Sequence, residues 1–392
     1  MSDHLAKRVA GFGTSVFTEM SRLAVQHGAV NLGQGFPDFA GPDFVKEAAI
    51  QAIRADLNQY AVSHGTPRLR RAIAENWQRA TGRALDPETE VSVGSGATEV
   101  LLDAILGLVN PGDEVILFEP FYDSYLPDVL MAGGTPRFAT LLPPDWHFDR
   151  QALADLFSPR TRLVLINTPH NPTGKVFSRE ELSFIGSLCQ RHDALVLTDE
   201  VYEQIRFDGA DHVPMATLPG MWERTLTVNS TGKTFSMTGW KIGYAVGPAA
   251  LNRAVRATHQ FVTFSTSTPF QEAMATAMET AARLGYYDRL RREYTARRDL
   301  LAGALKAAGL TTLTVQGSYF LLADLTGMGF PDDVSFCRYL TADIGVAAIP
   351  PSAFYAEPRR APLLARFCFA KRDETLRAAA ERLQRLRTSR RP

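Results

Sequence analysis

Two lysines stand close together in a segment rich in small residues. Lys233 follows the apolar run 226–228 within Ser-Thr-Gly-Lys-Thr, and Lys241 comes just before the next apolar run, 242–246. A single lysine is most often a solvated surface residue, so neither position is informative alone. Two lysines that are flanked by glycines and apolar strands, near a hydroxyl, are much less often idle. The pair is therefore a candidate for a functional site.

An acid and an amide follow two other apolar runs. Asp199 ends the run 194–198 and Tyr202 comes three residues later, so both would share a face if a helical turn starts there. Asn171 lies in Asn-Thr-Pro-His-Asn-Pro, where the following proline holds it away from helical angles. Each residue also has a plain structural interpretation, Asp199 as a helix N-cap and Asn171 as a turn former. Local context leaves both interpretations open.

Small residues start a helix directly after the run 91–93. The segment Gly-Ser-Gly-Ala-Thr-Glu contains Gly96 and Ala97, whose backbone N–H groups can approach an anion, and Thr98, which can donate a hydroxyl. The segment matches neither a Walker motif nor a G-x-G-x-x-G fingerprint. A plain helix start with a tight turn explains it equally well, so the segment by itself leaves the choice open.

The elements that must position these groups are short strands alternating with longer helical patterns. The predicted strands are 91–93, 115–118, 137–139, 163–166, 195–198, 226–228 and 242–246. Several are near-continuous apolar runs, which are typical of strands buried on both faces of a mostly parallel sheet. In such sheets ligands bind beyond the carboxyl ends of the strands. We therefore expect an α/β fold, with a large domain over residues 40–285 built on a mostly parallel seven-stranded sheet.

The pattern changes from about residue 286. A long arginine-rich helix is followed by strand-like runs at 318–323, 346–349 and 366–369 and by a final helix. This order predicts a smaller α+β domain made of residues 1–39 and 286–392. Leucines and tyrosines interleave the densest basic stretch, which suggests the solvated face of an amphipathic helix. The arginines of this stretch are Arg289, Arg291, Arg292, Arg297 and Arg298.

Composition excludes several classes of protein. Lysine and arginine number 42 and aspartate and glutamate 42, so no net charge recruits nucleic acid or an anionic membrane. Cys189, Cys337 and Cys368 match neither a metal spacing nor a disulfide framework, so we expect no metal site and a reducing compartment. The chain has no apolar signal core and no run long enough to span a membrane. We expect a cytoplasmic protein.

Read in order, these segments resemble the class I/II aminotransferases of pyridoxal-phosphate fold type I. The similarity extends over nearly the whole chain, from residue 31 to residue 369, and is greatest to the kynurenine/glutamine and methionine aminotransferases. The motifs that carry it are NLGQGFPDF, FEPFYDSY, NTPHNPTGK, DEVYE, STGKTFSMTGWKIGY and RFCFAK. The resemblance implies a pyridoxal 5′-phosphate cofactor. It also implies ping-pong transfer of an amino group from methionine, glutamine or an aromatic amino acid to a 2-oxo acid.

The resemblance also implies roles for the reacting residues. Lys233 would form the Schiff base with the cofactor and carry the proton taken from the substrate Cα. Asp199 would pair with the pyridine nitrogen, and Tyr122 would stack on the ring. Tyr202 and Asn171 would both bond the phenolic oxygen of the cofactor, and Asn171 would also border the substrate.

Two anionic groups remain to be bound, the cofactor phosphate and the substrate carboxylate. Arg366 would bind the carboxylate bidentately, with the backbone of Gly35 nearby. The resemblance assigns the phosphate to Gly96, Ala97, Thr98, Ser230 and Lys241, and to Tyr60 of the other subunit of a homodimer. Many relatives carry arginine at the position of Lys241, so here a point charge replaces a planar fork.

The segment 259–268 bears on the substrate. By resemblance it lies at a wall contributed by the neighbouring subunit, where aspartate-specific relatives place an arginine. A second carboxylate requires a second cation, because a buried unpaired charge is costly. This segment contains no lysine or arginine but offers Phe261 and Phe264, which favours uncharged donors. The phenylalanines could instead be ordinary core, and His259 could supply a cation.

Other functions stay open within and outside the family. N-succinyldiaminopimelate aminotransferases and aspartate aminotransferases have similar sequences, and β-elimination from cysteine conjugates uses the same cofactor. The fold also serves as an effector-sensing module in transcription regulators. That function requires a DNA-binding domain, and this chain begins close to the first family motif. We therefore expect an enzyme.

Overall fold

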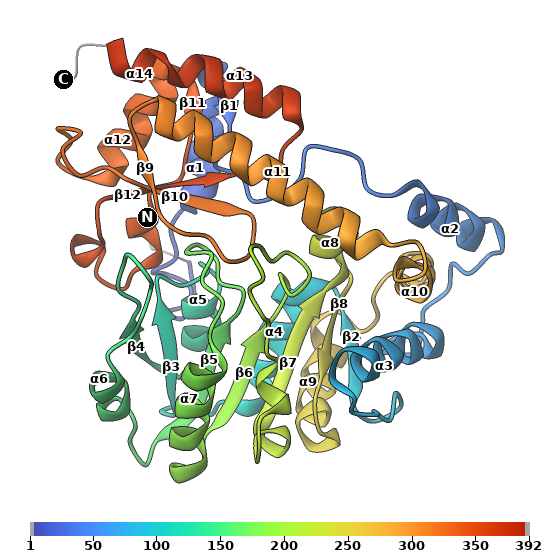
Figure 1. Ribbon diagram of the computed structural model, residues 1–392. Helices are drawn as coiled ribbons and strands as arrows, with labels where there is room; N and C mark the ends of the chain where they lie inside the picture. The colour runs from blue at the N-terminus through green and yellow to red at the C-terminus, as the bar shows by residue number, and fades with distance from the viewer. Residues whose placement is uncertain (1–3, 389–392) are drawn as a thin grey trace.

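A seven-stranded sheet occupies the lower part of the molecule in Figure 1, a computed structural model that describes residues 4–388. The strand order is β2-β8-β7-β6-β5-β3-β4. β8 runs antiparallel to both of its neighbours, and all other pairs are parallel. The strands are β2 (Val91–Gly94), β3 (Glu114–Glu119), β4 (Thr135–Thr140), β5 (Thr161–Asn167), β6 (Leu195–Asp199), β7 (Thr225–Ser230) and β8 (Gly243–Val246). The predicted mostly parallel sheet is confirmed.

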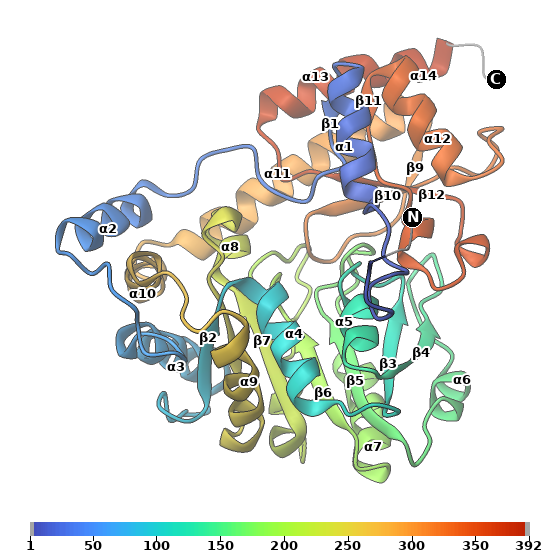
Figure 2. The same cartoon turned by 180° about the vertical axis from the view of Figure 1, so that it is seen from behind.

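Helices cover both faces of this sheet, which explains its apolar strands. In β3, Val115 and Leu117 face one apolar cluster, whereas Ile116 and Phe118 face another. The first cluster includes α4 (Gly96–Leu108), α5 (Tyr125–Met131) and α9 (Ala249–Val262), seen from behind in Figure 2. The second includes α6 (Arg150–Asp155) and α7 (Arg179–Arg191). Both side-chain directions of these strands are therefore buried.

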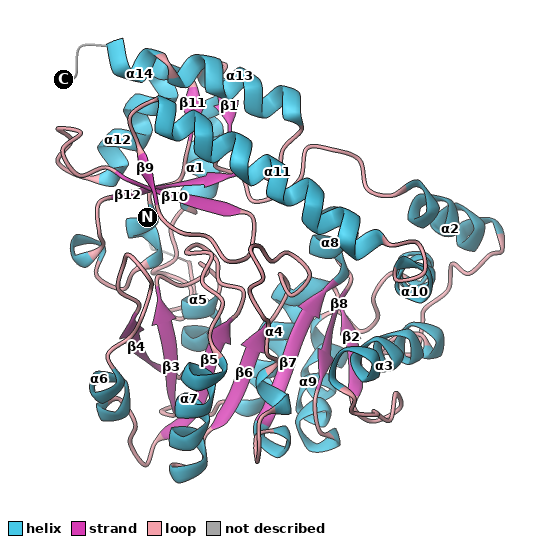
Figure 3. Ribbon diagram, viewed as in Figure 1, coloured by secondary structure: helices cyan, strands magenta, loops and turns pink. Residues whose placement is uncertain are grey.

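The upper part of the molecule joins the two ends of the chain. β1 (Val30–Asn31) pairs in parallel with β11 (Val346–Ala347), and β12-β10-β9 form a small antiparallel sheet (Figure 3). The strands of that sheet are β9 (Thr311–Thr312), β10 (Phe320–Asp324) and β12 (Leu364–Cys368). The helices of this upper part are α1 (Val16–Gln26), α11 (Tyr286–Ala307), α12 (Asp333–Tyr339), α13 (Asp373–Leu383) and α14 (Arg385–Thr388). The domain boundaries given above stay predictions.

Two details of this part differ from expectation. The strand predicted from residue 318 begins at Phe320, because Ser318 has a φ of 63° and cannot extend a strand. The arginine-rich helix forms, but its arginines are not all solvated. Arg297 stacks over Phe39 at 4.1 Å, and Arg298 pairs with Asp208. The apolar stems of these arginines therefore extend the core instead of facing water.

The other α-helices of the described residues lie beside the seven-stranded sheet or next to its strands. They are α2 (Asp43–Arg54), α3 (Pro67–Thr81), α8 (Thr231–Thr234) and α10 (Thr268–Ala281). α10 packs against both α2 and α3 at one side of the sheet, as Figures 1 and 2 show. Within residues 4–388 no helix is both long and apolar enough to cross a membrane.

Candidate active site

A cavity lies beyond the carboxyl ends of β5, β6 and β7, between these strands and the start of α4. Most of the residues singled out in the sequence line it, although they come from distant segments. The lining residues are Gly96, Ala97, Thr98, Leu101, Tyr122, Tyr125, Asn167, Asn171, Asp199, Val201, Tyr202, Ser230, Lys233, Thr238 and Lys241. Parallel strands bring these segments together because their carboxyl ends share one edge of the sheet.

Lys233 lies in the single turn of α8, directly after β7. Its Nζ donates a hydrogen bond to the hydroxyl of Tyr319 at 3.1 Å, and that hydroxyl donates to the carbonyl of Gly35 at 2.6 Å. Burial lowers the pKa of Lys233 to about 8, although the charge of Asp199 opposes this shift. A larger fraction of the amine is therefore neutral near pH 7 than for a solvated lysine, as a nucleophile or base requires.

Asp199 ends β6 with a buried carboxylate. Its Oδ2 accepts a hydrogen bond from the hydroxyl of Tyr125 at 2.6 Å, and its Oδ1 accepts one from the backbone N–H of Val201 at 3.2 Å. Burial raises the pKa of Asp199, although these hydrogen bonds and the charge of Lys233 oppose the shift. In the described residues no helix directly follows β6, so the interpretation of Asp199 as a helix N-cap is wrong. The carboxylate instead bonds the turn at residues 201–204 and lines the cavity with Tyr202.

Two asparagines tie the end of β5 to the rest of the site. Asn167 accepts a hydrogen bond from the backbone N–H of Asn171 at 2.6 Å and donates to the carbonyl of Asp199 at 2.8 Å. Asn171 in turn accepts a hydrogen bond from Arg366 at 2.9 Å. The turn is therefore fixed from both sides, with the Asn171 side chain between the cavity and Arg366.

Arg366, in β12, is 1% exposed and does not itself line the cavity. Its guanidinium lies 4.1 Å from the ring centre of Phe320 and donates to the carbonyl of Gly33 at 2.9 Å. The role expected for the backbone of Gly35, two residues after Gly33, stays a prediction. The Nε of Arg366 has no hydrogen-bond partner in the described chain. A buried cationic donor without a partner fits a site for an external anion.

The start of α4 forms a cradle of backbone N–H groups, here called the amide cradle (residues 95–98). Ser95 is the N-cap of α4 but makes no side-chain capping bond, since its hydroxyl is bonded to that of Thr266. The N–H of Ser95 is bonded to the carboxylate of Glu99, but the N–H groups of the first residues of α4, from Gly96 to Thr98, have no partner within the helix and remain available to an anion. A side chain at Gly243 would collide with the backbone of Gly96 at 2.3 Å. Only glycine lets β8 approach the cradle this closely.

Cationic and hydroxyl groups surround the amide cradle. A methyl group on Gly96 would lie 3.1 Å from Nζ of Lys241, so the lysine reaches directly over the cradle. Ser230 caps α8 by accepting a hydrogen bond from Gly232 at 3.2 Å. Tyr122 lies edge to face with Tyr125 at 5.6 Å. The donor set suits a dianionic phosphate at one end of an aromatic pocket.

Tyr60 stands apart from these residues. Its side chain is 81% exposed, lies outside the cavity, and contacts Phe264 edge to face at 5.2 Å. Phe261 is 86% exposed, so the interpretation of these phenylalanines as ordinary core is wrong. His259 is buried and bonded to Glu99, which leaves it no free position for a substrate carboxylate.

Sequence reasoning missed three residues of the site. Tyr125 bonds Asp199, Asn167 bonds the turn of Asn171, and Tyr319 bonds Lys233. Tyr125 follows Tyr122 by three residues, so a shared helical face was a usable signal. Tyr319 directly precedes β10 of the small antiparallel sheet, and no local pattern connects it to Lys233.

Comparisons with known proteins agree with this site. Residues 28–383 match the family model of the aminotransferases of class I and II. The chain is 43% identical to kynurenine–oxoglutarate transaminase of Dictyostelium discoideum, with 97% of this chain and 96% of the relative covered. An Escherichia coli structure, reported with a methionine aminotransferase function, superposes with a TM-score of 0.94 at 43% identity over 97% and 99% of the chains. N-succinyldiaminopimelate aminotransferase of Mycobacterium tuberculosis superposes with a TM-score of 0.93 at 47% identity over 97% and 100%.

This chain belongs to the class I and II aminotransferases. It is an aminotransferase of the pyridoxal-phosphate-dependent α/β type, and the family resemblance of its sequence is confirmed. The cavity fits that cofactor, because it combines a half-buried amine, a buried carboxylate and the start of a helix without a side-chain cap from its N-cap residue.

Proposed function

We propose that the cavity binds pyridoxal 5′-phosphate through Lys233. The protein then transfers the amino group of methionine, glutamine or an aromatic amino acid to a 2-oxo acid by a ping-pong mechanism. The observation that carries this proposal is the presence of Lys233, Asp199 and the amide cradle in one cavity. A lysine beside an anion site and a buried acid is the set that this cofactor requires.

When bound, the cofactor supplies an electron sink for negative charge at the substrate Cα. Asp199 would hold a proton on the pyridine nitrogen, since a buried carboxylate favours a nearby cation. Tyr202 and Asn171 would bond the phenolic oxygen, and Tyr122 would stack on the ring. The amide cradle would bind the phosphate group together with Ser230 and Lys241.

Lys233 would also move protons during the reaction. A neutral Nζ would take the proton from the substrate Cα, and its pKa of about 8 places the amine close to the working range of a general base. The hydrogen bond to Tyr319 at 3.1 Å would orient this nitrogen. Arg366 would bind the substrate carboxylate, with its unpartnered Nε as one donor.

Exposed aromatic and aliphatic side chains support a homodimer. Tyr60, Val62, Phe261 and Phe264 are between 46% and 86% exposed in the single chain. A group of apolar side chains of this kind marks a surface for another protein. The role proposed for Tyr60 is to reach the phosphate group in the active site of the partner subunit. The cytoplasmic location expected from the sequence stays a prediction.

The same surface supports an uncharged amino donor. A substrate with a second carboxylate needs a second cation, and the segment 259–268 offers none that is free, because His259 is occupied by Glu99. Phe261 and Phe264 would instead contact an apolar side chain, and each buried CH₂ contributes about 0.8 kcal/mol. N-succinyldiaminopimelate is the second candidate, favoured by the 47% identity to the mycobacterial enzyme.

A panel of amino donors tests the proposed substrate class. Half-reaction kcat/KM is measured for methionine, glutamine, phenylalanine, aspartate and N-succinyldiaminopimelate on one preparation. We expect at least one of the first three to exceed aspartate about tenfold or more, as two or three buried CH₂ groups allow. Aspartate in first place would overturn the substrate class, and N-succinyldiaminopimelate in first place would establish the second candidate.

A further inference from the structure

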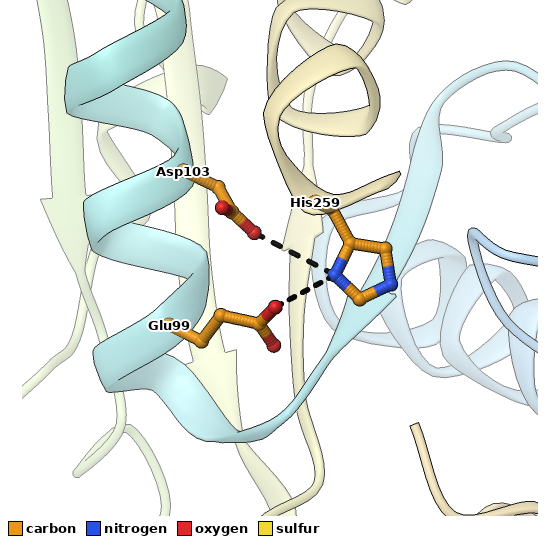
Figure 4. A group of neighbouring side chains, drawn as sticks. All are labelled: Glu99, Asp103 and His259. Atoms are coloured by element: carbon orange, nitrogen blue, oxygen red, sulfur yellow. Dashed lines mark hydrogen bonds and ion pairs between the residues drawn. The ribbon is translucent and has the colours of Figure 1, made fainter. Parts of the chain in front are cut away.

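A charged cluster lies directly behind the amide cradle, on the side of α4 that faces α9 (Figure 4). His259 of α9 places Nδ1 2.8 Å from Oε1 of Glu99 and 3.6 Å from Oδ2 of Asp103. Glu99 and Asp103 are one helical turn apart on α4, so both carboxylates face the same ring. The side chains of all three residues are less than 10% exposed.

The hydrogen bonds identify the charge on His259. Nε2 is 2.8 Å from the carbonyl oxygen of Ser63, and Nδ1 contacts a carboxylate oxygen. The carbonyl oxygen can only accept, and although burial opposes it, the hydrogen bonds to Glu99 from His259 and Ser95 lower the pKa of that carboxylate, which therefore also accepts. Both ring nitrogens then donate and the ring is an imidazolium. Burial alone would lower the pKa of His259, but Asp103 and Glu99 outweigh burial and raise it to about 9.

The cluster is connected to the amide cradle through Glu99. Its Oε2 accepts a hydrogen bond from the backbone N–H of Ser95, the residue that precedes Gly96. The hydroxyl of Ser95 is held by Thr266, a few residues beyond the end of α9. Glu99 therefore fixes the peptide between Gly94 and Ser95, directly before the peptides whose N–H groups stay available to an anion, and His259 fixes Glu99.

The cluster also reaches the segment that carries Tyr60. Ser63, whose carbonyl accepts the hydrogen bond from Nε2, is three residues after Tyr60. The carbonyl of the next residue, His64, accepts a hydrogen bond from the backbone N–H of Val93 in β2. One imidazolium thus connects the amide cradle of this chain to the segment proposed to enter the partner's site. The two parts lie more than 30 residues apart in the sequence.

Asp103 indicates that the cluster does more than stabilise the fold. It is 0% exposed, and neither carboxylate oxygen has a hydrogen-bond partner in the described part of the chain. An apolar residue there would avoid the cost of desolvating a carboxylate, so stability alone does not account for the acid. Asp103 is well placed, however, to keep His259 charged.

We propose that His259, held by Glu99 and Asp103, is a positioning residue for the cofactor phosphate. It sets the peptides of the amide cradle and the Tyr60 segment in the arrangement that binds the phosphate group. This inference rests on the proposed phosphate site in the cradle. Its consequence is that the cluster controls cofactor affinity without touching the cofactor.

Cofactor affinity of His259→Gln tests the inference. The dissociation constant of pyridoxal phosphate is measured by absorbance titration of protein from which cofactor has been removed. We expect it to rise at least tenfold in His259→Gln and severalfold in the isosteric variant Asp103→Asn. At saturating cofactor, kcat and the KM for the amino donor should stay within about threefold of the wild type, because no residue that contacts substrate has changed.

Asn252→Ala is the matched control. Asn252 lies on the same helix, is equally buried, and donates to the carbonyl of Gly247 at 2.8 Å, away from the cradle. Its melting temperature should fall while its cofactor affinity stays within twofold of the wild type. If His259→Gln and Asp103→Asn behave like this control, the cluster is purely structural and the inference is wrong.

Two further outcomes separate this inference from its alternatives. Wild-type protein that fails to bind pyridoxal phosphate would overturn the proposed function itself, before any variant is compared. Stoichiometric zinc or manganese in purified wild-type holoenzyme, absent from Asp103→Asn, would make the cluster a metal site and overturn the positioning role. If His259→Gln does not fold, the cofactor affinity of Asp103→Asn decides between a positioning and a purely structural role, because asparagine keeps the shape of the side chain and removes its charge.

Discussion

The two sides of the active site differ in how completely one chain builds them. On the inner side, Asp199 is buried, Lys233 is half-buried, both are hydrogen-bonded within the chain, and Glu99 bonds the N–H of Ser95 behind the amide cradle. On the outer side, Tyr60 and Phe261 project into solvent with more than 80% of their surface exposed. This difference supports the proposal that one chain fixes the chemistry of the cofactor, whereas substrate choice and the last phosphate contact would depend on a second chain.

Asp199→Asn should give the largest loss, because it changes the inner side. Without a carboxylate the pyridine nitrogen would lose its proton and the ring its strength as an electron sink, so kcat should fall at least about 100-fold. Cofactor absorbance should remain, since Lys233 is intact. Stopped-flow half-reaction rates with methionine measure the effect, and a loss of only a few fold would remove Asp199 from the mechanism.

Arg366→Lys tests the proposed binding of the substrate carboxylate, because Arg366 lies behind Asn171 at the edge of the cavity. Replacing the planar fork by a point charge removes one charge-assisted hydrogen bond, so kcat/KM should fall about 10- to 100-fold, mostly through KM. Arg338→Lys is the control, since Arg338 is 59% exposed and pairs with Glu19 at the surface. Equal effects in both variants would show that Arg366 does not bind the carboxylate.

Tyr60→Phe, measured alone and in hybrid dimers, tests whether Tyr60 contributes to the phosphate site of the partner subunit. The single variant should bind the cofactor about tenfold more weakly, the value of one charge-assisted hydrogen bond. Chains with Tyr60→Phe are then mixed with chains that carry Lys233→Ala. If Tyr60 acts on the partner, each hybrid has one site with both native residues, and that site should bind with native affinity.

The contradicting result for the hybrid is equally clear. If Tyr60 acted within its own chain, no site of the hybrid would contain both Tyr60 and Lys233, and native affinity would not return. An active monomer, measured by sedimentation at the assay concentration, would rule out a shared site altogether.

The smallest effect is expected for the melting temperature of His259→Gln, compared with the wild type at different pH values. The pKa of His259 is raised from about 6.5 to about 9 by Glu99 and Asp103. Its charge therefore contributes stability that is complete below pH 6.5 and is lost as the pH rises through 9. The melting temperature of the wild type should exceed that of His259→Gln by a few degrees at pH 6. The difference should shrink toward pH 10, and a difference independent of pH would mean that folding does not shift the pKa of His259.

Most of the sheet was predictable from sequence because its strands are buried on both faces. All seven predicted strands form, since runs such as 163–166 have no polar residue to face water. The small antiparallel sheet was harder to delimit. Its strand β10 starts after Ser318, whose left-handed backbone no local pattern announced. Arg297 and Arg298 also pack on aromatic rings that are remote in sequence.

Site residues that closely follow a strand could be predicted from the sequence, whereas contacts between residues from distant elements could not. Lys233, Asp199 and Asn171 lie at strand ends, and the rule for parallel sheets places such ends together. Tyr319 and the His259 cluster depend on contacts between distant elements. No sequence pattern indicates that His259 is a buried cation, because the helix sequence around it is the same whether the ring is neutral or protonated.

Chemical trapping of the cofactor tests the central claim most directly. Wild-type protein is loaded with pyridoxal phosphate, reduced with borohydride and digested, and the modified lysine is located by mass spectrometry. Lys233 should carry the label stoichiometrically, and Lys233→Ala should carry none while retaining its melting temperature within a few degrees. A label on Lys241 instead, or equal labelling in Lys233→Ala, would contradict the account.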